Sequence, residues 1–302
     1  MTHPGALRNP VGTHVKVGKG LTAGALATAH EIGAETLQVF VGNPRGWALS
    51  EGDPREDERF AAACTETGVR AFVHTPYLVN LGSPTAATFQ RSVASVAHNL
   101  RRAARLGAEG VVVHTGSCVD DGTFDAALRQ VGEGLLPVLA ELDDQLGDDA
   151  PWLLLEPTAG QGRSLCATVE DLGPYLGVLE RHPGVGVCLD TCHVFAAGAP
   201  LDEPGGTTAT LDLLVEVIGP DRLRLVHAND SKDPRGSLRD RHEQIGQGHI
   251  GTGAFVELLA HPATHGVPLV LETPGAGEPG GPCLPLLRGL RDGAPRVESK
   301  AS

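Results

Sequence analysis

Six histidine and carboxylate side chains stand where short apolar runs of the sequence end. They are His74 in FVHTPY, His114 in VVHTGS, Glu156 in LLEPTA, Asp190 in CLDTCH, His227 in LVHAND and Glu272 in VLETPG. One such residue alone is usually a hydrogen-bonded structural group. If the runs are parallel strands of one barrel, however, all six point into the same mouth. Three carboxylates and three imidazoles cannot be buried together unless cations neutralise the carboxylates, so the pattern predicts a metal cluster.

Three further candidate ligands lie on the segments that follow these runs. His193 comes shortly after Asp190, and Asp240 and His242 flank an arginine in a long loop. Since carboxylates can bridge, nine ligands suit about three ions with about four or five ligands each. Five histidines and four carboxylates favour Zn²⁺ and are compatible with Mn²⁺ or Fe²⁺, whereas they match an all-oxygen Mg²⁺ site poorly.

The residue types also indicate a class of reaction. The sequence has no evident motif for a nucleophilic serine or cysteine. Closely spaced divalent ions instead suggest hydrolysis by metal-activated water, particularly of phosphate esters. Two ions can activate the water and neutralise the phosphoryl oxygens, while a third stabilises the departing alkoxide. That division of roles suits a phosphodiester.

The elements that position these residues alternate along the chain. Eight strand-like runs are VGTHVKV, LQVFV, RAFVHTPY, GVVVHTGS, PWLLLEPT, GVGVCLDTCH, RLRLVHAND and VPLVLETPG. Helical segments lie between them, such as 21–34, 84–108 and 124–146. The near-continuous apolar character of the runs is typical of parallel strands covered on both faces. Eight such units predict a TIM (β/α)₈ barrel with the metal cluster at its carboxyl end. An open doubly wound sheet is the alternative, but the GKG at residues 18–20 matches its glycine fingerprint poorly.

Length and composition fit one globular domain. The chain has 302 residues, 41% of them hydrophobic. We expect a barrel over residues 11–291, flexible ends at 1–10 and 292–302, and long functional loops at 198–208 and 229–253. The first residues do not resemble a signal peptide and no apolar stretch is long enough to cross a bilayer, so a cytoplasmic location without membrane contact is expected. The six scattered cysteines are expected to be reduced, and Cys188 and Cys192 are expected to pack at a buried strand end.

The net charge of −13 argues against a protein that coats nucleic acid non-specifically, because the release of counterions from nucleic acid favours binding by basic surfaces. It does not exclude a local groove lined by metal ions, whose positive charge the sequence count omits.

Long collinear motifs show that the sequence resembles the endonuclease IV family, the zinc-dependent apurinic/apyrimidinic endonucleases of base-excision repair. The resemblance covers residues 11–274. It rests on HTPYLVNLGSP, EPTAGQG, GVCLDTCHVFAAG, HANDSK, DRHEQIGQGHIG and LVLETP in the family's order. It implies one zinc at His74, His114 and Glu156, with Glu156 bridging to a second. Asp190, His227 and Glu272 would hold that second zinc, and the third would be held by His193, Asp240 and His242.

The resemblance also implies a reaction and a partner. A hydroxide shared by two zincs would attack the phosphorus on the 5′ side of an abasic sugar in double-stranded DNA, leaving a 3′-hydroxyl and a 5′-deoxyribose phosphate, and blocked 3′ ends would be trimmed at the same site. We expect Glu156 and Glu272 to act in catalysis and the protein to be a monomer. Family members flip the damaged nucleotide out and fill the gap with side chains, which match Arg45, Tyr77 and Leu78 here. An apolar or planar wedge replaces lost stacking.

Two more residues gain roles from the same resemblance. Arg241, between two implied ligands, is expected to face a phosphate. His14, on the first strand, is expected to support the ligands without binding metal itself. The sequence departs from the family's pattern at Pro157, where an asparagine is usual, and in the turn KVGKG with its two lysines. Neither departure touches an implied ligand, so they put loop contacts with DNA in doubt rather than the chemistry.

Two other functions compete with this hypothesis. Sugar isomerases and epimerases on related barrels also gather His, Asp and Glu at strand ends for one or two divalent ions, but they have no need of the triplet His193, Asp240 and His242. A non-catalytic DNA-binding or metal-storage module is the third class, and the acidic net charge makes it a poor fit.

Overall fold

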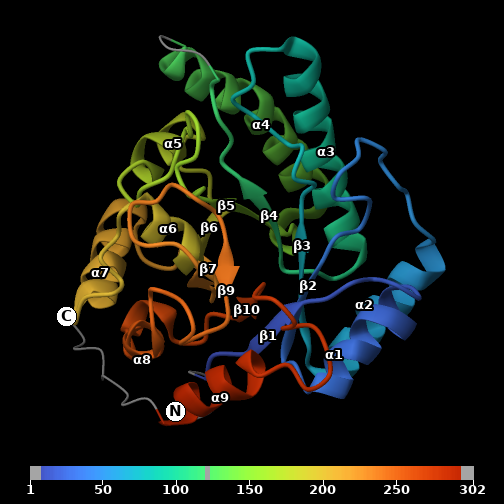
Figure 1. Cartoon of the computed structure of the whole chain (residues 1–302). Coiled ribbons are helices and arrows are strands. Elements are labelled where there is room, and N and C mark those ends of the chain that lie inside the picture. Colours follow the sequence, from blue (N-terminus) through green and yellow to red (C-terminus); the bar gives the residue numbers. More distant parts are fainter. Residues whose placement is uncertain (1–7, 120–122, 294–302) are drawn as a thin grey trace, which may run out of the picture.

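A closed barrel of eight parallel strands forms the centre of the molecule (Figure 1). The computed structural model describes residues 8–119 and 123–293. The barrel strands are β1 (Val11–His14), β2 (Thr36–Val39), β3 (Arg70–His74), β4 (Gly110–His114), β5 (Trp152–Glu156), β6 (Val185–Asp190), β7 (Leu223–His227) and β10 (Leu269–Leu271). They correspond to the eight predicted runs, so the TIM barrel prediction is confirmed.

Pairing between the two ends of the chain closes the barrel. β1 pairs with β2 on one side, where Gly12 lies opposite Thr36, and with β10 on the other, where Val11 lies opposite Leu269. A Cβ on Gly12 would come 1.6 Å from the Thr36 carbonyl oxygen. The close approach of β1 to β2 therefore requires glycine at this position.

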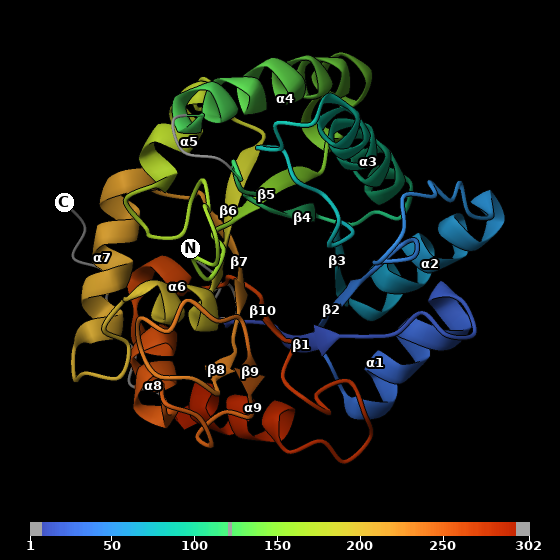
Figure 2. The same cartoon turned by 45° about the horizontal axis from the view of Figure 1, so that its top comes forward.

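Helices surround the strands on all sides (Figure 2). They are α1 (Ala27–Ile32), α2 (Pro54–Thr67), α3 (Ala86–Arg105), α4 (Phe124–Leu146), α5 (Leu172–Val178), α6 (Thr191–Ala197), α7 (Gly206–Ile218), α8 (Thr252–Ala260) and α9 (Cys283–Gly293). A π-helical turn at Leu21–Leu26 leads into α1, and short 3-10 turns occupy Gly147–Asp149 and Pro262–Thr264. Within the described residues, no helix combines the length and the apolar character that a membrane span requires.

Local signals in the sequence explain where α2 begins and ends. The Asp53 side chain accepts a hydrogen bond from the Arg55 amide at 3.0 Å, and Pro54 is the first helical residue. Gly68, with φ of 69°, ends the helix. On its inner face, Asp57 forms a two-pronged ion pair with Arg102 of α3, with N–O distances of 2.7 and 2.8 Å. Both side chains are buried, so this pair fixes α2 against α3.

One layer of apolar side chains fills the barrel interior. It consists of Phe72, Val112, Leu154, Cys188, Leu225 and Val270. Side chains alternate between the two faces of a strand, so the residue two positions later also points inward, one level closer to the carboxyl end. In all six strands that residue is a histidine or a carboxylate: His74, His114, Glu156, Asp190, His227 and Glu272. The apolar layer therefore lies directly beneath the polar cluster, one level closer to the amino ends of the strands.

The two long loops contain secondary structure that the sequence did not reveal. The segment 198–208 runs into α7 at Gly206. The segment 229–253 contains a small antiparallel pair, β8 (Asp230–Ser231) and β9 (His242–Glu243), and reaches the start of α8. The expected flexible ends, 1–10 and 292–302, fall mostly outside the described residues. Where the chain is described, Asn9 is buried and its amide donates to the carbonyls of Thr264 and Val267.

All six cysteines are buried, and no disulfide joins any two of them within residues 8–119 and 123–293. This agrees with the expectation of reduced thiols and with the expected burial of Cys188 and Cys192.

Candidate metal centre

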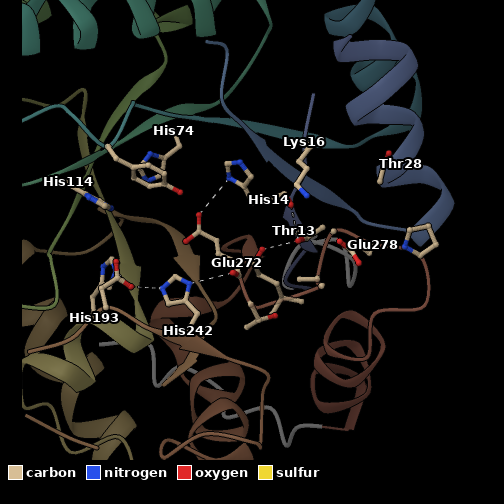
Figure 3. Close-up of a pocket in the computed structure, with 18 residues that line it drawn as sticks. Thr13, His14, Lys16, Thr28, His74, His114, His193, His242, Glu272 and Glu278 are labelled. Atoms are coloured by element: carbon tan, nitrogen blue, oxygen red, sulfur yellow. Dashed lines mark hydrogen bonds and ion pairs between the residues drawn. The ribbon is translucent and has the colours of Figure 1, made fainter. Parts of the chain in front are cut away.

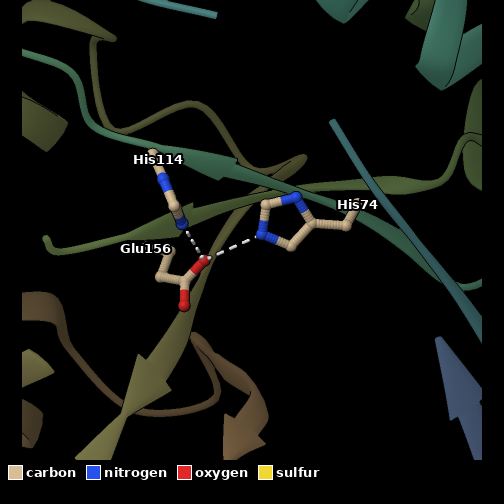
Figure 4. Close-up of side chains that lie close together, drawn as sticks. All are labelled: His74, His114 and Glu156. Carbon is tan, nitrogen blue, oxygen red and sulfur yellow. Dashed lines mark hydrogen bonds and ion pairs between the residues drawn. The ribbon is translucent and has the colours of Figure 1, made fainter. Parts of the chain in front are cut away.

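Glu156, at the end of β5, is the centre of the cluster and is fully buried. Its Oε2 lies 3.2 Å from Nε2 of His74 and 3.2 Å from Nε2 of His114 (Figure 4). Its Oε1 lies 2.8 Å from Nδ1 of His227. One carboxylate therefore faces two groups of ligands, which is the arrangement that a bridging ligand needs.

A second group gathers around His227 at the end of β7. Nδ1 of His227 lies 3.2 Å from Oε2 of Glu272 and 3.7 Å from Oδ2 of Asp190. Together with Glu156, these residues bring one donor atom each to within 4.8 Å of one another. Three carboxylates and one imidazole in so small a buried space could hold a divalent cation.

A third group combines α6 with the loop after β7. His193 Nε2 and His242 Nε2 lie 3.2 and 3.1 Å from Oδ1 of Asp240. His242 Nε2 also lies 3.5 Å from Oδ2 of Asp190, so this group borders the second one. The structure thus brings all nine predicted ligands into one cluster at the carboxyl end of the barrel.

Asp230 shapes the loop that carries Asp240 and His242. Its buried carboxylate accepts hydrogen bonds from backbone amides on both sides of the loop, at Ser231, Gly246, Gly248, Ile250 and Gly251. In the β8–β9 pair, His242 lies opposite Ser231. A carboxylate with this many amide donors holds a loop that would otherwise lack backbone partners.

The histidine rings are oriented for a cation on their inner side. Nδ1 of His74 donates to the Thr75 carbonyl at 2.7 Å, and Nδ1 of His193 donates to the Pro157 carbonyl at 3.0 Å. In each neutral ring this leaves Nε2 with a lone pair facing the carboxylates. Nε2 of His193 and of His242 are buried and lie close to Oδ1 of Asp240, but neither forms a hydrogen bond of acceptable geometry with any described residue. Orphaned lone pairs beside buried carboxylates fit a bound metal ion.

The charges of the side chains in the cluster also favour a bound cation. Burial would lower the pKa of His242, but Asp190 and Asp240 raise it to about 9. Burial likewise opposes the charged form of His193, yet Asp190 and Asp240 hold its pKa well above the ordinary value. Burial alone would raise the pKa of Glu272, whereas His227 lowers it to about 2. The pKa values of Glu156 and Asp240 are also lowered, so these two carboxylates and Glu272 stay ionised and need positive charge from protons or from cations.

A cavity of about 480 Å³ opens beside the cluster (Figure 3). Its walls include ligand candidates on one side and Lys16, Thr28 and Glu278 on the other. Tyr77 also lines it. Lys16 belongs to the KVGKG turn and supplies the one lysine or arginine among the described lining residues. The cavity extends beyond the predicted metal ligands, so it can hold more than the metal ions.

Comparisons with known proteins identify the family. The family described as xylose isomerase-like TIM barrel matches residues 26–295. The chain is 56% identical over 290 residues to a probable endonuclease 4 of Streptomyces avermitilis, covering 96% of this chain and 93% of that protein. The crystal structure of endonuclease IV from Thermus thermophilus superposes with a TM-score of 0.79 at 34% identity, covering 94% of this chain and 99% of that one.

The chain belongs to the endonuclease IV family. Likeness to other members of the wider fold is weaker: a xylose isomerase domain protein from Planctomyces limnophilus has a TM-score of 0.68 at 17% identity, with 97% of this chain and 99% of that chain covered. That likeness concerns the fold alone.

Of the side chains that the resemblance to endonuclease IV assigns to DNA, Tyr77 lines the pocket. The Tyr77 amide donates to the Pro44 carbonyl at 2.9 Å, which places Tyr77 beside the turn that carries Arg45. Tyr77 is 56% exposed, and Leu78 and Arg45 are also exposed. The guanidinium of Arg241 is bound to the carboxylate of Asp233, with Nε 2.6 Å from Oδ2, and Arg241 does not line the described pocket.

Gln38 and Asn229 are buried contacts of the cluster that the sequence reasoning missed. Asn229 Nδ2 donates to Oδ2 of Asp190 at 2.7 Å, and its Oδ1 accepts from the Glu272 amide at 2.8 Å. Gln38 contacts Glu272, His227 and His14. The signal for Gln38 was a lone amide within the apolar run LQVFV. His14, expected to support the cluster, lies 3.7 Å from Glu272, and burial lowers its pKa to about 4.

Proposed function

We propose that this protein is a DNA-repair endonuclease that hydrolyses the phosphodiester on the 5′ side of abasic sites. The products are a 3′-hydroxyl and a 5′-deoxyribose phosphate, and blocked 3′ ends are trimmed at the same site. The observation that carries the proposal is the convergence of nine histidine and carboxylate side chains in a member of the endonuclease IV family. The proposed substrate is double-stranded DNA, bound by a monomer.

Three zinc ions are the proposed cofactors. His74, His114 and Glu156 would hold the first, and Glu156 would share the second with Asp190, His227 and Glu272. His193, Asp240 and His242 would hold the third. When bound, zinc supplies an activated water and positive charge for the phosphoryl and leaving oxygens. Mn²⁺ or Fe²⁺ in some positions is compatible with the same donors.

The protein's own groups have three tasks in this proposal. Glu156 and Glu272 keep their negative charge in a buried site and hold the cations in place. The carbonyls of Thr75 and Pro157 fix two histidine rings with Nε2 toward the cluster. The contact with His193 is made by the main-chain carbonyl of residue 157, so it does not depend on whether that residue is proline or the family's usual asparagine.

Arg45, Tyr77, Leu78 and Arg241 are the proposed DNA contacts. Tyr77 lines the pocket and is exposed, as is Leu78, the next residue in the chain, and the two would fill the gap left by a flipped abasic nucleotide. Arg45 is exposed, and its main-chain amide, not its guanidinium, donates to Oδ1 of Asn43. Arg241 would have to share its guanidinium between Asp233 and DNA.

A duplex with a single abasic analogue at a known position tests the proposal. The purified zinc-loaded protein is expected to cut on the 5′ side and to leave a 3′ end that a polymerase extends. Protein stripped of metal is expected to be inactive and to recover activity when zinc is restored. Full nicking by the stripped protein, or ketose–aldose interconversion without nicking, would refute it and favour a different reaction.

A further inference from the structure

Gln38, in the middle of β2, is fully buried, and its amide touches three side chains of the site. Nε2 donates to Oε1 of Glu272 at 2.8 Å and lies 3.1 Å from Nδ1 of His14. Oε1 lies 2.9 Å from Nε2 of His227. Both ends of the amide are therefore engaged.

These contacts fix the direction of every hydrogen bond. The Glu272 carboxylate can only accept, so the amide nitrogen of Gln38 must face it. The amide oxygen then faces His227, whose Nε2 must donate the proton. In the neutral ring, Nδ1 of His227 is left with its lone pair. This atom lies 2.8 Å from Oε1 of Glu156 and 3.2 Å from Oε2 of Glu272, on the side of the cluster where an ion would be bound.

Other rings of the cluster are held by the main chain. His74, His193 and His242 each direct Nδ1 at a backbone carbonyl, of Thr75, Pro157 and Glu272 respectively. For His227, the same task falls to a side chain, which a substitution can remove. Ligand histidines depend on such partners for their orientation and basicity.

We propose that Gln38 is a positioning residue that holds His227 in the Nε2–H tautomer and fixes Glu272, so that both present their donor atoms to the ion they share with Asp190. The inference rests on the proposed function, because it assumes a metal ion at this group. It predicts that Gln38 governs the affinity of one ion and leaves the other two unaffected.

The test is Gln38→Met, which keeps the length of the side chain but removes the donor and the acceptor. Zinc affinity is measured by competition with chelators of graded strength. One ion is expected to bind about 10–100-fold more weakly than in the wild type, with the other two unchanged. In the nicking assay kcat is expected to fall while KM for DNA changes little.

Gln130→Met is the matched control, since Gln130 also uses its amide for two hydrogen bonds, to the carbonyls of Leu81 and Ser83 at 3.0 Å each. It is expected to keep all zinc ions at wild-type affinity. Wild-type zinc affinity at every site in Gln38→Met would overturn the inference.

A second measurement needs no variant and so does not depend on how Gln38→Met folds. In zinc-loaded wild-type protein labelled with ¹⁵N-histidine, the proton of His227 is expected on Nε2, and a proton on Nδ1 would overturn the inference. The two proposals fail separately. A wild type that binds no zinc and cuts no abasic DNA would contradict the proposed function, whereas an active wild type with an unaffected Gln38→Met variant would contradict only the role of Gln38.

Discussion

Glu272 has one carboxylate oxygen hydrogen-bonded to Gln38 and the other 3.2 Å from His227. Glu272→Gln removes its charge with little change in volume. We predict that cleavage of abasic duplex falls by about 10²–10³-fold or more, because the substitution weakens the charge that holds a cation. Much of the DNA binding should remain, since its proposed contacts lie elsewhere. A nicking assay beside a gel-shift measurement checks both statements.

Glu278→Gln is the matched control, because Glu278 lines the same pocket but lies exposed at its far edge. It should cut at nearly the wild-type rate. Turnover retained in Glu272→Gln would count against metal-dependent hydrolysis.

Zinc binding is also predicted to release protons from the histidine ligands. In the metal-free cluster, neighbouring carboxylates overcome the effect of burial and raise the pKa of His242 to about 9, and the pKa of His193 and His227 also lies well above the ordinary value. The raised pKa values favour protonated rings when no cation is bound, so zinc must displace protons. Zinc affinity should weaken as the pH falls from about 9 toward 6. Calorimetry in two buffers of different ionisation enthalpy measures the protons released, and pH-independent affinity without proton release would contradict the prediction.

The nine candidate ligands could be predicted from the sequence because their type contrasts with their surroundings. Six of them interrupt apolar strands at the same level, and three share short motifs with a known family. Gln38 could not be recognised in this way, since one amide in a strand has many structural explanations. The pairing of Arg241 with Asp233 depends on how a long loop folds, and spacing alone does not encode it.

Among the elements, the contact of α2 with α3 depends on one buried ion pair. Arg102 is only 5% exposed. Asp57→Ala therefore leaves the charge of Arg102 buried without its main partner. We predict a loss of about 3–5 kcal/mol in the free energy of unfolding, measured by urea denaturation. The double variant Asp57→Leu with Arg102→Met should recover much of that loss, since no charge then stays buried. A change below about 1 kcal/mol in Asp57→Ala would show that the pair does not fix these helices.

The strands were easier to predict than the segments between them. All eight strand runs have an apolar core, so their alternation with helical segments was enough to predict them. The helix α6 begins directly after Asp190, with no loop between, and its first turn carries His193. The short pair β8 and β9 is held by backbone amides that converge on Asp230, and such a contact has no periodic signal in the sequence.

At the level of the whole molecule, closure of the barrel brings the candidate ligands together. Six of the ligands stand at the ends of the neighbouring strands β3, β4, β5, β6, β7 and β10, and the other three come from the segments after β6 and β7. Closure through β1 and β2 brings the two ends of this row of strands to one mouth. The sequence carries a net charge of −13, and a site that binds three divalent cations would supply positive charge at the mouth where DNA is proposed to bind. In the proposed function the metal would therefore serve both the reaction and the encounter with DNA.

Zinc content and nicking, titrated together, test the central claim most directly. Metal-free protein receives increasing zinc, bound zinc per chain is determined by elemental analysis, and each sample is assayed on a duplex with one tetrahydrofuran abasic analogue. We predict saturation at about three zinc ions per chain, with cleavage 5′ to the lesion appearing only as the sites fill. Saturation at one or two ions with no cut at any occupancy would contradict the account and favour a sugar isomerase on the same barrel.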